Sequence, residues 1–125
     1  RFSSEHMTPA AGQGALALEA RRGDEVPAAA AAAVTDRKAI IEFTAERAAL
    51  SQLGASCNTP VGLHARIADD ELSVEGFAGL PDGSEWVRDR VAGDPNQPGA
   101  LGVDLAKRMR AAGATEILER AESAA

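Results

Sequence analysis

The sequence predicts an α+β domain in which a three-stranded antiparallel sheet carries helices on one face. Two helical stretches precede residue 54, one of them rich in alanine. Between residues 61 and 91 apolar and polar side chains alternate with a period of two, and helical spacing returns after residue 98. Grouped helices and strands, which do not alternate one by one, are typical of a two-layer α+β fold.

A short first helix is predicted at residues 28–34. A polar linker at 22–25 precedes it, and Pro27 occupies a position that the first turn of a helix tolerates. The alanines that follow have high helix propensity. A flexible low-complexity tract is the alternative interpretation.

A longer second helix is predicted to run from a cap at Thr35 or Asp36 to about Leu53, with Gly54 as its C-cap. Its apolar residues form a stripe that we expect to face the core: Ile40, Phe43, Leu50 and Leu53, flanked by Ile41, Ala45, Ala48 and Ala49. Arg47 interrupts this stripe. Such a cation either binds an anionic cofactor or pairs with a carboxylate while its stem packs as an apolar arm, and the second role is the commoner one.

Three strands of a meander are predicted at residues 61–67, 72–80 and 85–91. Turn residues at 69–71 and 81–84 separate them. Pairing across the second turn places Trp86 opposite Gly79, where the aromatic side chain would cover the bare glycine. It also places Phe77 opposite Arg88, whose guanidinium could lie over the ring. We expect a neighbouring domain to dock on the resulting aromatic patch.

Two helices are predicted after a breaker-rich loop at residues 93–98. Leu101, Leu105 and Met109 repeat at helical spacing, and Gly113 marks the end of that helix. A short final helix is expected at 116–121, with its apolar side chains turned inward.

A separate strand is predicted at residues 14–20, before the linker. Leu16 and Leu18 lie on one side of it, with alanines and Glu19 between them and around them, as in a strand covered on both faces. It has no partner nearby in the sequence, so we expect it outside the main core. It would be frayed, paired with an edge of the meander, or paired with the same strand of a second copy in a strand-exchanged dimer.

Composition excludes several classes of function. The chain of 125 residues has a net charge of −6 and a pI near 4.9, which argues against a nucleic-acid groove. It has one cysteine, no apolar run of about 20 residues and no signal-peptide pattern. We therefore expect no membrane partner and a cytoplasmic location. Residues 1–7 contain no helix start, which suggests that the chain is part of a longer protein.

Cys57, the only cysteine, is the candidate functional residue. Burial in the core is the most frequent role of a free cysteine. A redox role lacks a resolving thiol, and a metal site would need His64 with Asp69 or Asp70 and still fall short of a structural zinc set, so no metal is predicted. Cys57 follows a helix C-terminus, whose partial negative charge disfavours a thiolate. That position suits a thiol that reacts once and stays capped better than a nucleophile that regenerates at every turnover.

Two segments together resemble one known family. The first reads Glu46-Arg47-Ala48, then Leu50, Leu53, Cys57, Pro60 and Gly62, and the second is the stretch PAAGQGALALEAR at residues 9–21. With residues 9–21 preceding the cysteine segment at this spacing, the two segments resemble the C-terminal portion of the porphobilinogen deaminase family, also called hydroxymethylbilane synthases. The family usually has Glu-Gly-Gly before the cysteine, whereas this chain has Gly54-Ala55-Ser56.

The resemblance implies a function and a site. Cys57 would carry a covalent dipyrromethane cofactor, on which four molecules of porphobilinogen are condensed with loss of ammonia to give hydroxymethylbilane. Gln13 and Gly14 would line the active cleft, and Arg21 would close the same strand. Residues 1–23 would then be a strand segment and linker of a first domain, and residues 24–125 the cofactor-attachment domain.

The resemblance also implies what the chain lacks. The general acid/base aspartate and most arginines that bind substrate carboxylates belong to the family's N-terminal domains, so no catalytic residue is predicted within this chain, and those domains are its expected partners. A non-catalytic interaction module on the same α+β scaffold is the alternative hypothesis.

Overall fold

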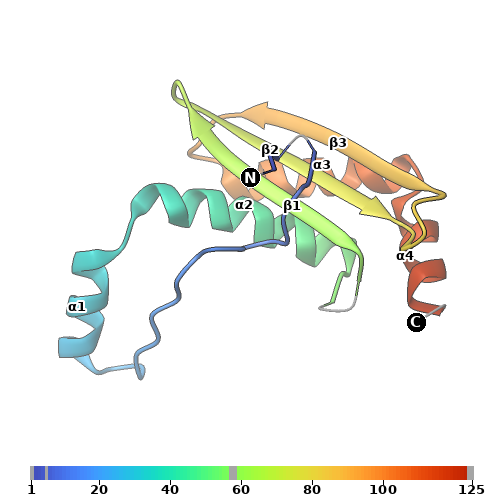
Figure 1. Cartoon of the computed structure of the whole chain (residues 1–125). Coiled ribbons are helices and arrows are strands. Elements are labelled where there is room, and N and C mark those ends of the chain that lie inside the picture. Colours follow the sequence, from blue (N-terminus) through green and yellow to red (C-terminus); the bar gives the residue numbers. More distant parts are fainter. Residues whose placement is uncertain (1, 5, 57–58, 124–125) are drawn as a thin grey trace.

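Two layers form the body of the molecule, a sheet and the helices that cover one of its faces (Figure 1). The computed structural model describes residues 2–4, 6–56 and 59–123. The described elements are α1 (Glu25–Val34), α2 (Arg37–Leu53), β1 (Val61–Ala68), β2 (Glu71–Gly79), β3 (Trp86–Gly93), α3 (Pro98–Ala111) and α4 (Ala114–Ser123). The predicted α+β class and the order of these elements are confirmed.

The three strands form an antiparallel meander in the order β1-β2-β3. Asp69 and Asp70 both have positive φ, which permits the tight turn between β1 and β2. The predicted register is confirmed, because Gly79 lies opposite Trp86 and Phe77 opposite Arg88. Phe77 stacks on Trp86, with ring centroids 6.2 Å apart.

The core lies between the sheet and the helices α2, α3 and α4. Its largest fully buried side chains are Leu63, Leu72, Val74, Leu105 and Met109. They come from β1, β2 and α3, so the inward alternation of the strands meets one face of a helix. On α4, Ile117 and Leu118 are buried as predicted.

The helices α2 and α3 approach each other closely at Gly102. A Cβ added there would overlap the Ala45 carbonyl oxygen and lie 3.0 Å from both the Ala48 Cβ and the Ala49 nitrogen. Small residues on both helices therefore bring the two backbones together.

The predicted buried face of α2 is confirmed for Leu50 and Leu53, which pack against the core, and is wrong for the first half of the helix. Ile40 and Phe43, expected in the core, are 52% and 42% exposed, whereas Ala45 and Ala49 are fully buried. Both faces of α2 carry apolar residues, so the periodicity was ambiguous. Packing decided it, because a row of alanines lets α3 lie closer than a row with Phe43 would.

An ion pair fastens α3 to β3. Arg108 Nε lies 2.7 Å from Asp89 Oδ2. The hydrogen bond from this guanidinium lowers the pKa of the Asp89 carboxyl. The pair's contribution to stability is therefore present near neutral pH and is lost as the pH falls through that lowered pKa.

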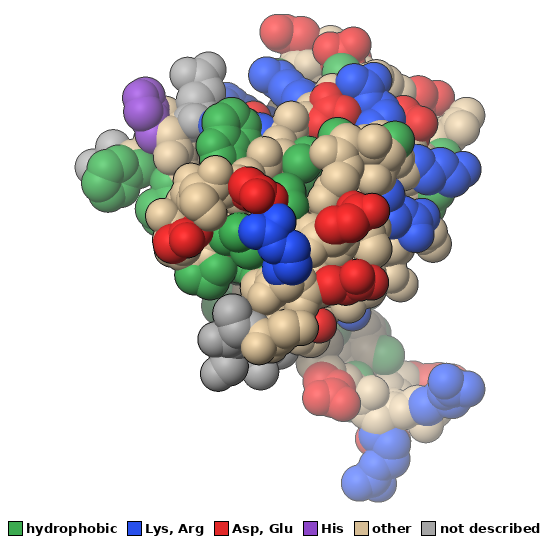
Figure 2. All heavy atoms as spheres, turned by 90° about the vertical axis from the view of Figure 1, so that its right-hand side faces the viewer, with side chains coloured by type: hydrophobic (Ala, Val, Ile, Leu, Met, Phe, Trp, Pro, Cys, Tyr) green, Lys and Arg blue, Asp and Glu red, His purple; other side chains and the backbone are tan. Residues whose placement is uncertain are grey.

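Helix α1 forms as predicted but contributes nothing to the core. None of its residues is buried, and Figure 2 shows a smaller lobe that projects from the body. Alanine propensity accounts for the helix. The cap of α2 is also confirmed, since Asp36 Oδ1 accepts hydrogen bonds from the N–H groups of Lys38 and Ala39. Within the described part of the chain, no helix is long and apolar enough to span a bilayer.

Side chains and one carbonyl close the free edge of β1. Three N–H groups on this edge have acceptors: Leu63 donates to the Pro9 carbonyl at 2.7 Å, Ala65 to Glu46 at 2.7 Å and Ile67 to Glu42 at 2.8 Å. An edge strand with its donors occupied cannot accept another strand there.

The strand predicted at residues 14–20 is not formed. Leu16 is 97% exposed and Leu18 is 65% exposed, and the backbone runs extended without a sheet partner among the described residues. The occupied edge of β1 explains why the stretch does not join that side of the sheet. Its expected place outside the main core is confirmed, whereas pairing with a second copy stays a prediction.

We expect this stretch to pair between molecules at high concentration, because two exposed leucines on an unpaired backbone invite strand exchange. Light scattering should then show the mass of the chain doubling as its concentration rises. The double variant Leu16→Ser, Leu18→Ser should stay monomeric. A parent chain that is monomeric at every concentration, with fast amide exchange across residues 15–20, would rule the dimer out.

Candidate functional site

The N-terminal residues lie across the sheet face opposite the helices (Figure 1). Arg88 on β3 donates to the Ser4 carbonyl and forms an ion pair with Glu75 on β2. Thr8 donates to the same Glu75 at 3.1 Å. A Cβ at Gly62 would lie 2.5 Å from the Thr8 carbonyl oxygen, so the glycine on β1 allows the backbones to meet.

A turn at residues 11–14 follows, and α2 holds it. The Gly12 N–H donates to Glu46 Oε2 at 2.6 Å. Gly12 has φ +71° and packs so closely on the Phe43 ring that an added Cβ would lie 2.7 Å from it. The side-chain oxygen of Gln13 accepts a hydrogen bond from the Ala10 N–H, and Gln13 is exposed.

The three predicted cleft residues do not gather at one point. Gln13 and Gly14, both exposed, lie in the turn that Glu46 holds, whereas the chain beyond residue 14 leaves the sheet and runs towards α1 (Figure 1). Arg21 lies at the far end of that extended run, where its carbonyl accepts from the Asp24 N–H. Gln13 and Gly14 therefore lie on the body of the molecule, and Arg21 lies near the start of α1.

An open groove separates the extended run from the helices. Its volume is about 680 Å³. Its lining is mainly apolar and comes from residues 11–12 and 14–18, the end of α1 and the first half of α2. The exposed large side chains in it are Leu16, Leu18, Val34, Ile40 and Phe43. Ile40 and Phe43, two of the α2 side chains predicted to enter the core, thus line this groove instead, whereas Leu50 and Leu53 pack against the core as predicted.

Helix α2 ends at the loop that carries the candidate cysteine. Gly54 has φ 68° and its N–H donates to the carbonyls of the last turn, so the predicted C-cap is confirmed. Cys57 itself lies outside the described residues. Before it, Ser56 is exposed and donates its N–H to the Thr59 Oγ1 at 2.8 Å. After it, the hydroxyl of buried Thr59 donates to Glu122 on α4 at 2.7 Å.

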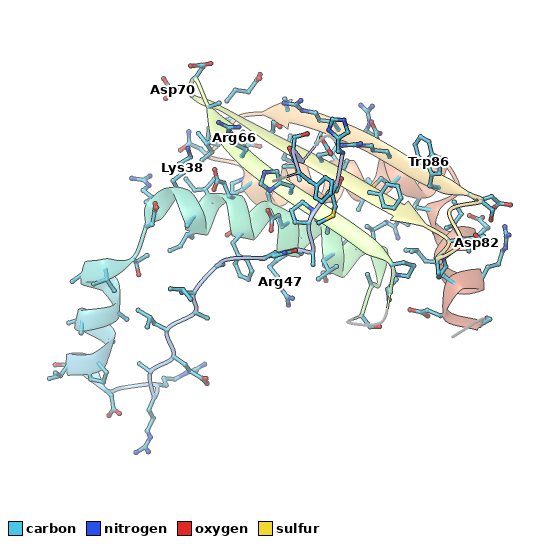
Figure 3. All side chains as sticks on the ribbon, viewed as in Figure 1. Lys38, Arg47, Arg66, Asp70, Asp82 and Trp86 are labelled. Atoms are coloured by element: carbon cyan, nitrogen blue, oxygen red, sulfur yellow. The ribbon has the colours of Figure 1, made fainter. Side chains whose placement is uncertain are left out.

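Arg47 projects from α2 away from the sheet (Figure 3). It is exposed and forms no ion pair with any described carboxylate. The prediction that Arg47 pairs with a carboxylate is therefore not supported within the described part. The physical reason is its position, because the helix face that carries Arg47 meets solvent rather than the sheet. The other interpretation, an anion ligand, stays open.

Among the described residues, His64 belongs to no metal site. Its Nδ1 lies 3.9 Å from Glu46 Oε1, and no group of three His, Cys, Asp or Glu among the described residues could hold a metal ion.

From the sequence, Glu46 is part of a motif and has no predicted structural role. The structure shows that its carboxylate links the N-terminal turn, α2 and β1. A signal was present, since Glu46 sits beside Ala45 on what became the buried face, and a carboxylate at such a position needs donors. Thr59 and Glu122 carried no comparable signal, because their contact joins residues 63 positions apart.

Comparison with known proteins agrees with the geometry of the domain. The sequence model described as "Porphobilinogen deaminase, C-terminal domain" matches residues 40–111, the stretch from α2 to the end of α3. Three bacterial relatives are each named porphobilinogen deaminase. The one from Campylobacter concisus is 39% identical over 124 residues, the one from Thiobacillus denitrificans 43% over 118, and the one from Deinococcus radiodurans 42% over 113.

These matches cover most of this chain and a minority of each relative. They span 99%, 94% and 90% of the chain but 40%, 39% and 37% of the three relatives. The chain thus corresponds to about two fifths of the length of the curated relatives it matches. The family match extends over more than half of its residues and includes the helix, sheet and loop described above, so the chain belongs to the porphobilinogen deaminase family, of which it represents the C-terminal portion.

Proposed function

We propose that this chain is the cofactor-bearing C-terminal portion of an enzyme that condenses four porphobilinogen molecules, with release of ammonia, to the linear tetrapyrrole hydroxymethylbilane. The observation that carries the proposal is the family match at residues 40–111, which contains the chain's single thiol. Relatives named as deaminases favour the enzyme over a non-catalytic interaction module. The acid/base and most carboxylate-binding groups would come from the N-terminal portion.

In this proposal Cys57 holds a dipyrromethane through a thioether. That bond would form by addition of the thiol across the exocyclic double bond of an azafulvene, with the sulfur joined to the carbon and the thiol proton taken up by the ring nitrogen. The described residues on either side are compatible with a bulky adduct, because Ser56 is exposed and Thr59 is tied to α4 by its bond to Glu122. When bound, the dipyrromethane supplies the primer on which the substrate units are joined.

The groups that would meet its carboxylates are partly within this chain. Arg47 is exposed and has no ion-pair partner among the described residues, so its guanidinium is available for a propionate or acetate. Gln13 and Gly14 would line the cleft beside it, and Arg21 would enter it when the extended run joins the sheet of the first domain.

The division of the chain follows from the same proposal. Residues 1–23 would complete the first domain and its linker, and 24–125 would be the attachment domain. The exposed leucines of the extended run support the first part, since such side chains are expected under another layer in the complete protein.

We call this chain fused behind the N-terminal portion of the Thiobacillus denitrificans relative the joined enzyme. We expect the joined enzyme to convert porphobilinogen and the isolated chain to be inactive. For each protein, the measurement is the consumption of porphobilinogen and the formation of the linear tetrapyrrole. Turnover by the isolated 125-residue chain, or a folded joined enzyme with no turnover, would contradict the proposal.

A further inference from the structure

The carboxylate of Glu46 connects three separate parts of the molecule. Its Oε1 accepts from the Ala65 N–H at 2.7 Å, and its Oε2 accepts from the Gly12 N–H at 2.6 Å. Glu46 is 7% exposed; its bond to Ala65 is buried and its bond to Gly12 is partly buried. Hydrogen bonds to an ionised group are about twice as strong as neutral ones. One side chain of α2 thus fixes the edge of β1 and the N-terminal turn together.

We propose that Glu46 is a positioning residue, which holds the turn at residues 11–14 on the attachment domain and thereby sets the place of Gln13 and Gly14. The functional part of this inference rests on the proposed deaminase activity. The turn would then move with the attachment domain, while the run beyond residue 14 follows the first domain.

Two further contacts limit the turn to one arrangement. The Pro9 carbonyl accepts from the Leu63 N–H at 2.7 Å, which aligns the chain with β1 just before the turn. The Phe43 ring lies against Gly12, where no side chain fits. Glu46 is the link between them, because its second oxygen reaches the N–H of Gly12 from the same helix that carries Phe43.

A carboxylate is required for this double role. Glutamine has one acceptor oxygen and an amide NH₂ in place of the other. In Glu46→Gln, one of the two backbone N–H groups must face that NH₂ and lose its acceptor. We expect Gly12 to lose it, since Ala65 is fixed by its place in a paired strand and the turn is held by fewer contacts.

Glu42 provides a matched control. It lies one helical turn earlier on α2, and it also accepts from a β1 N–H, that of Ile67 at 2.8 Å. None of its contacts given by the described residues reaches the N-terminal turn. If the two glutamates only fasten α2 to β1, both substitutions should change amide exchange at Gly12 alike. If Glu46 positions the turn, only the substitution at Glu46 should change it.

Amide hydrogen exchange of the 125-residue chain, read at Gly12 by NMR, tests the contact itself. We expect exchange at Gly12 to rise about tenfold or more in Glu46→Gln, as expected for loss of one charge-assisted hydrogen bond. Glu42→Gln should leave it within about twofold of the parent. Equal protection of Gly12 in Glu46→Gln and the parent would overturn the proposal.

A second variant covers the case in which Glu46→Gln does not fold. Gly12→Ala introduces a Cβ against the Phe43 ring at a positive φ, and it leaves the bond between Glu46 and Ala65 untouched. It should displace the turn while the sheet and helices keep their amide protection. A turn that stays protected in Gly12→Ala would also contradict the proposal.

The joined enzyme supplies the functional readout. With dipyrromethane confirmed by mass, kcat should fall about tenfold in Glu46→Gln and stay within about twofold of the parent in Glu42→Gln. Parent-like kcat in Glu46→Gln would refute the positioning role. A joined enzyme without dipyrromethane or turnover would count against the proposed function instead, and exchange at Gly12 would still decide whether Glu46 holds the turn.

Discussion

Replacing Cys57 with serine in the joined enzyme is expected to lower the rate of porphobilinogen turnover by about a thousandfold or more, because the attachment point of the primer is lost. A hydroxyl is a weak nucleophile at neutral pH, so we expect serine not to form the corresponding ether bond to the cofactor. The measurement is the initial rate of porphobilinogen consumption by purified parent and variant at equal concentration.

The fold should survive this substitution. Sulfur and oxygen differ little in size, and the bond between Thr59 and Glu122, which ties the end of the loop to α4, does not involve residue 57. Thermal unfolding within a few degrees of the parent is the control for correct folding. Parent-like turnover in a folded Cys57→Ser enzyme would remove Cys57 from the mechanism.

Gly102→Ala is expected to be the most destabilising single-methyl change that the structure identifies. The new Cβ would overlap the Ala45 carbonyl oxygen and press on Ala48, so α2 and α3 must separate. Overpacking of this kind costs about 1–3 kcal/mol, which outweighs the gain in helix propensity of up to about 1 kcal/mol. Urea unfolding of the 125-residue chain measures the difference.

Gly99→Ala is the matched control on the same helix. Apart from its chain neighbours and the backbone of its own helix, no heavy atom lies within 4 Å of a Cβ built there, so only the propensity term remains. The free energy of unfolding should be unchanged or rise by up to about 1 kcal/mol. Equal effects at positions 99 and 102 would show that helix propensity, and not the contact between α2 and α3, controls both.

The sequence was sufficient for the sheet because its signals were local. The period of two across β1 and β2, the turn residues between strands and the four-residue loop before Trp86 determined strands, register and order together. The capped start of α2 at Asp36 and its end at Gly54 were also predictable, since both depend on side chains within one turn of the helix.

What the sequence could not predict depends on contacts between distant residues. The side of α2 that enters the core was decided by Gly102 on α3, more than fifty positions from Ala45 in the chain. The failure of residues 14–20 to form a strand depends on acceptors that already occupy the edge of β1, two of them carboxylates of α2. No periodicity carries that information.

The candidate site divides in the same way. Cys57, Gln13, Gly14 and Arg21 were identified by their motifs, and the roles assigned to them stay predictions. Glu46 stood in a motif without a role, and only the three-dimensional structure shows that it joins Gly12 to Ala65.

Attachment of the cofactor at Cys57 is decided by the intact mass of the joined enzyme. We expect a mass above that of the sequence by one dipyrromethane, carried on the peptide that contains Cys57 and absent from the Cys57→Ser variant. An active enzyme whose mass equals that of its sequence alone, or whose adduct lies on another peptide, would contradict it.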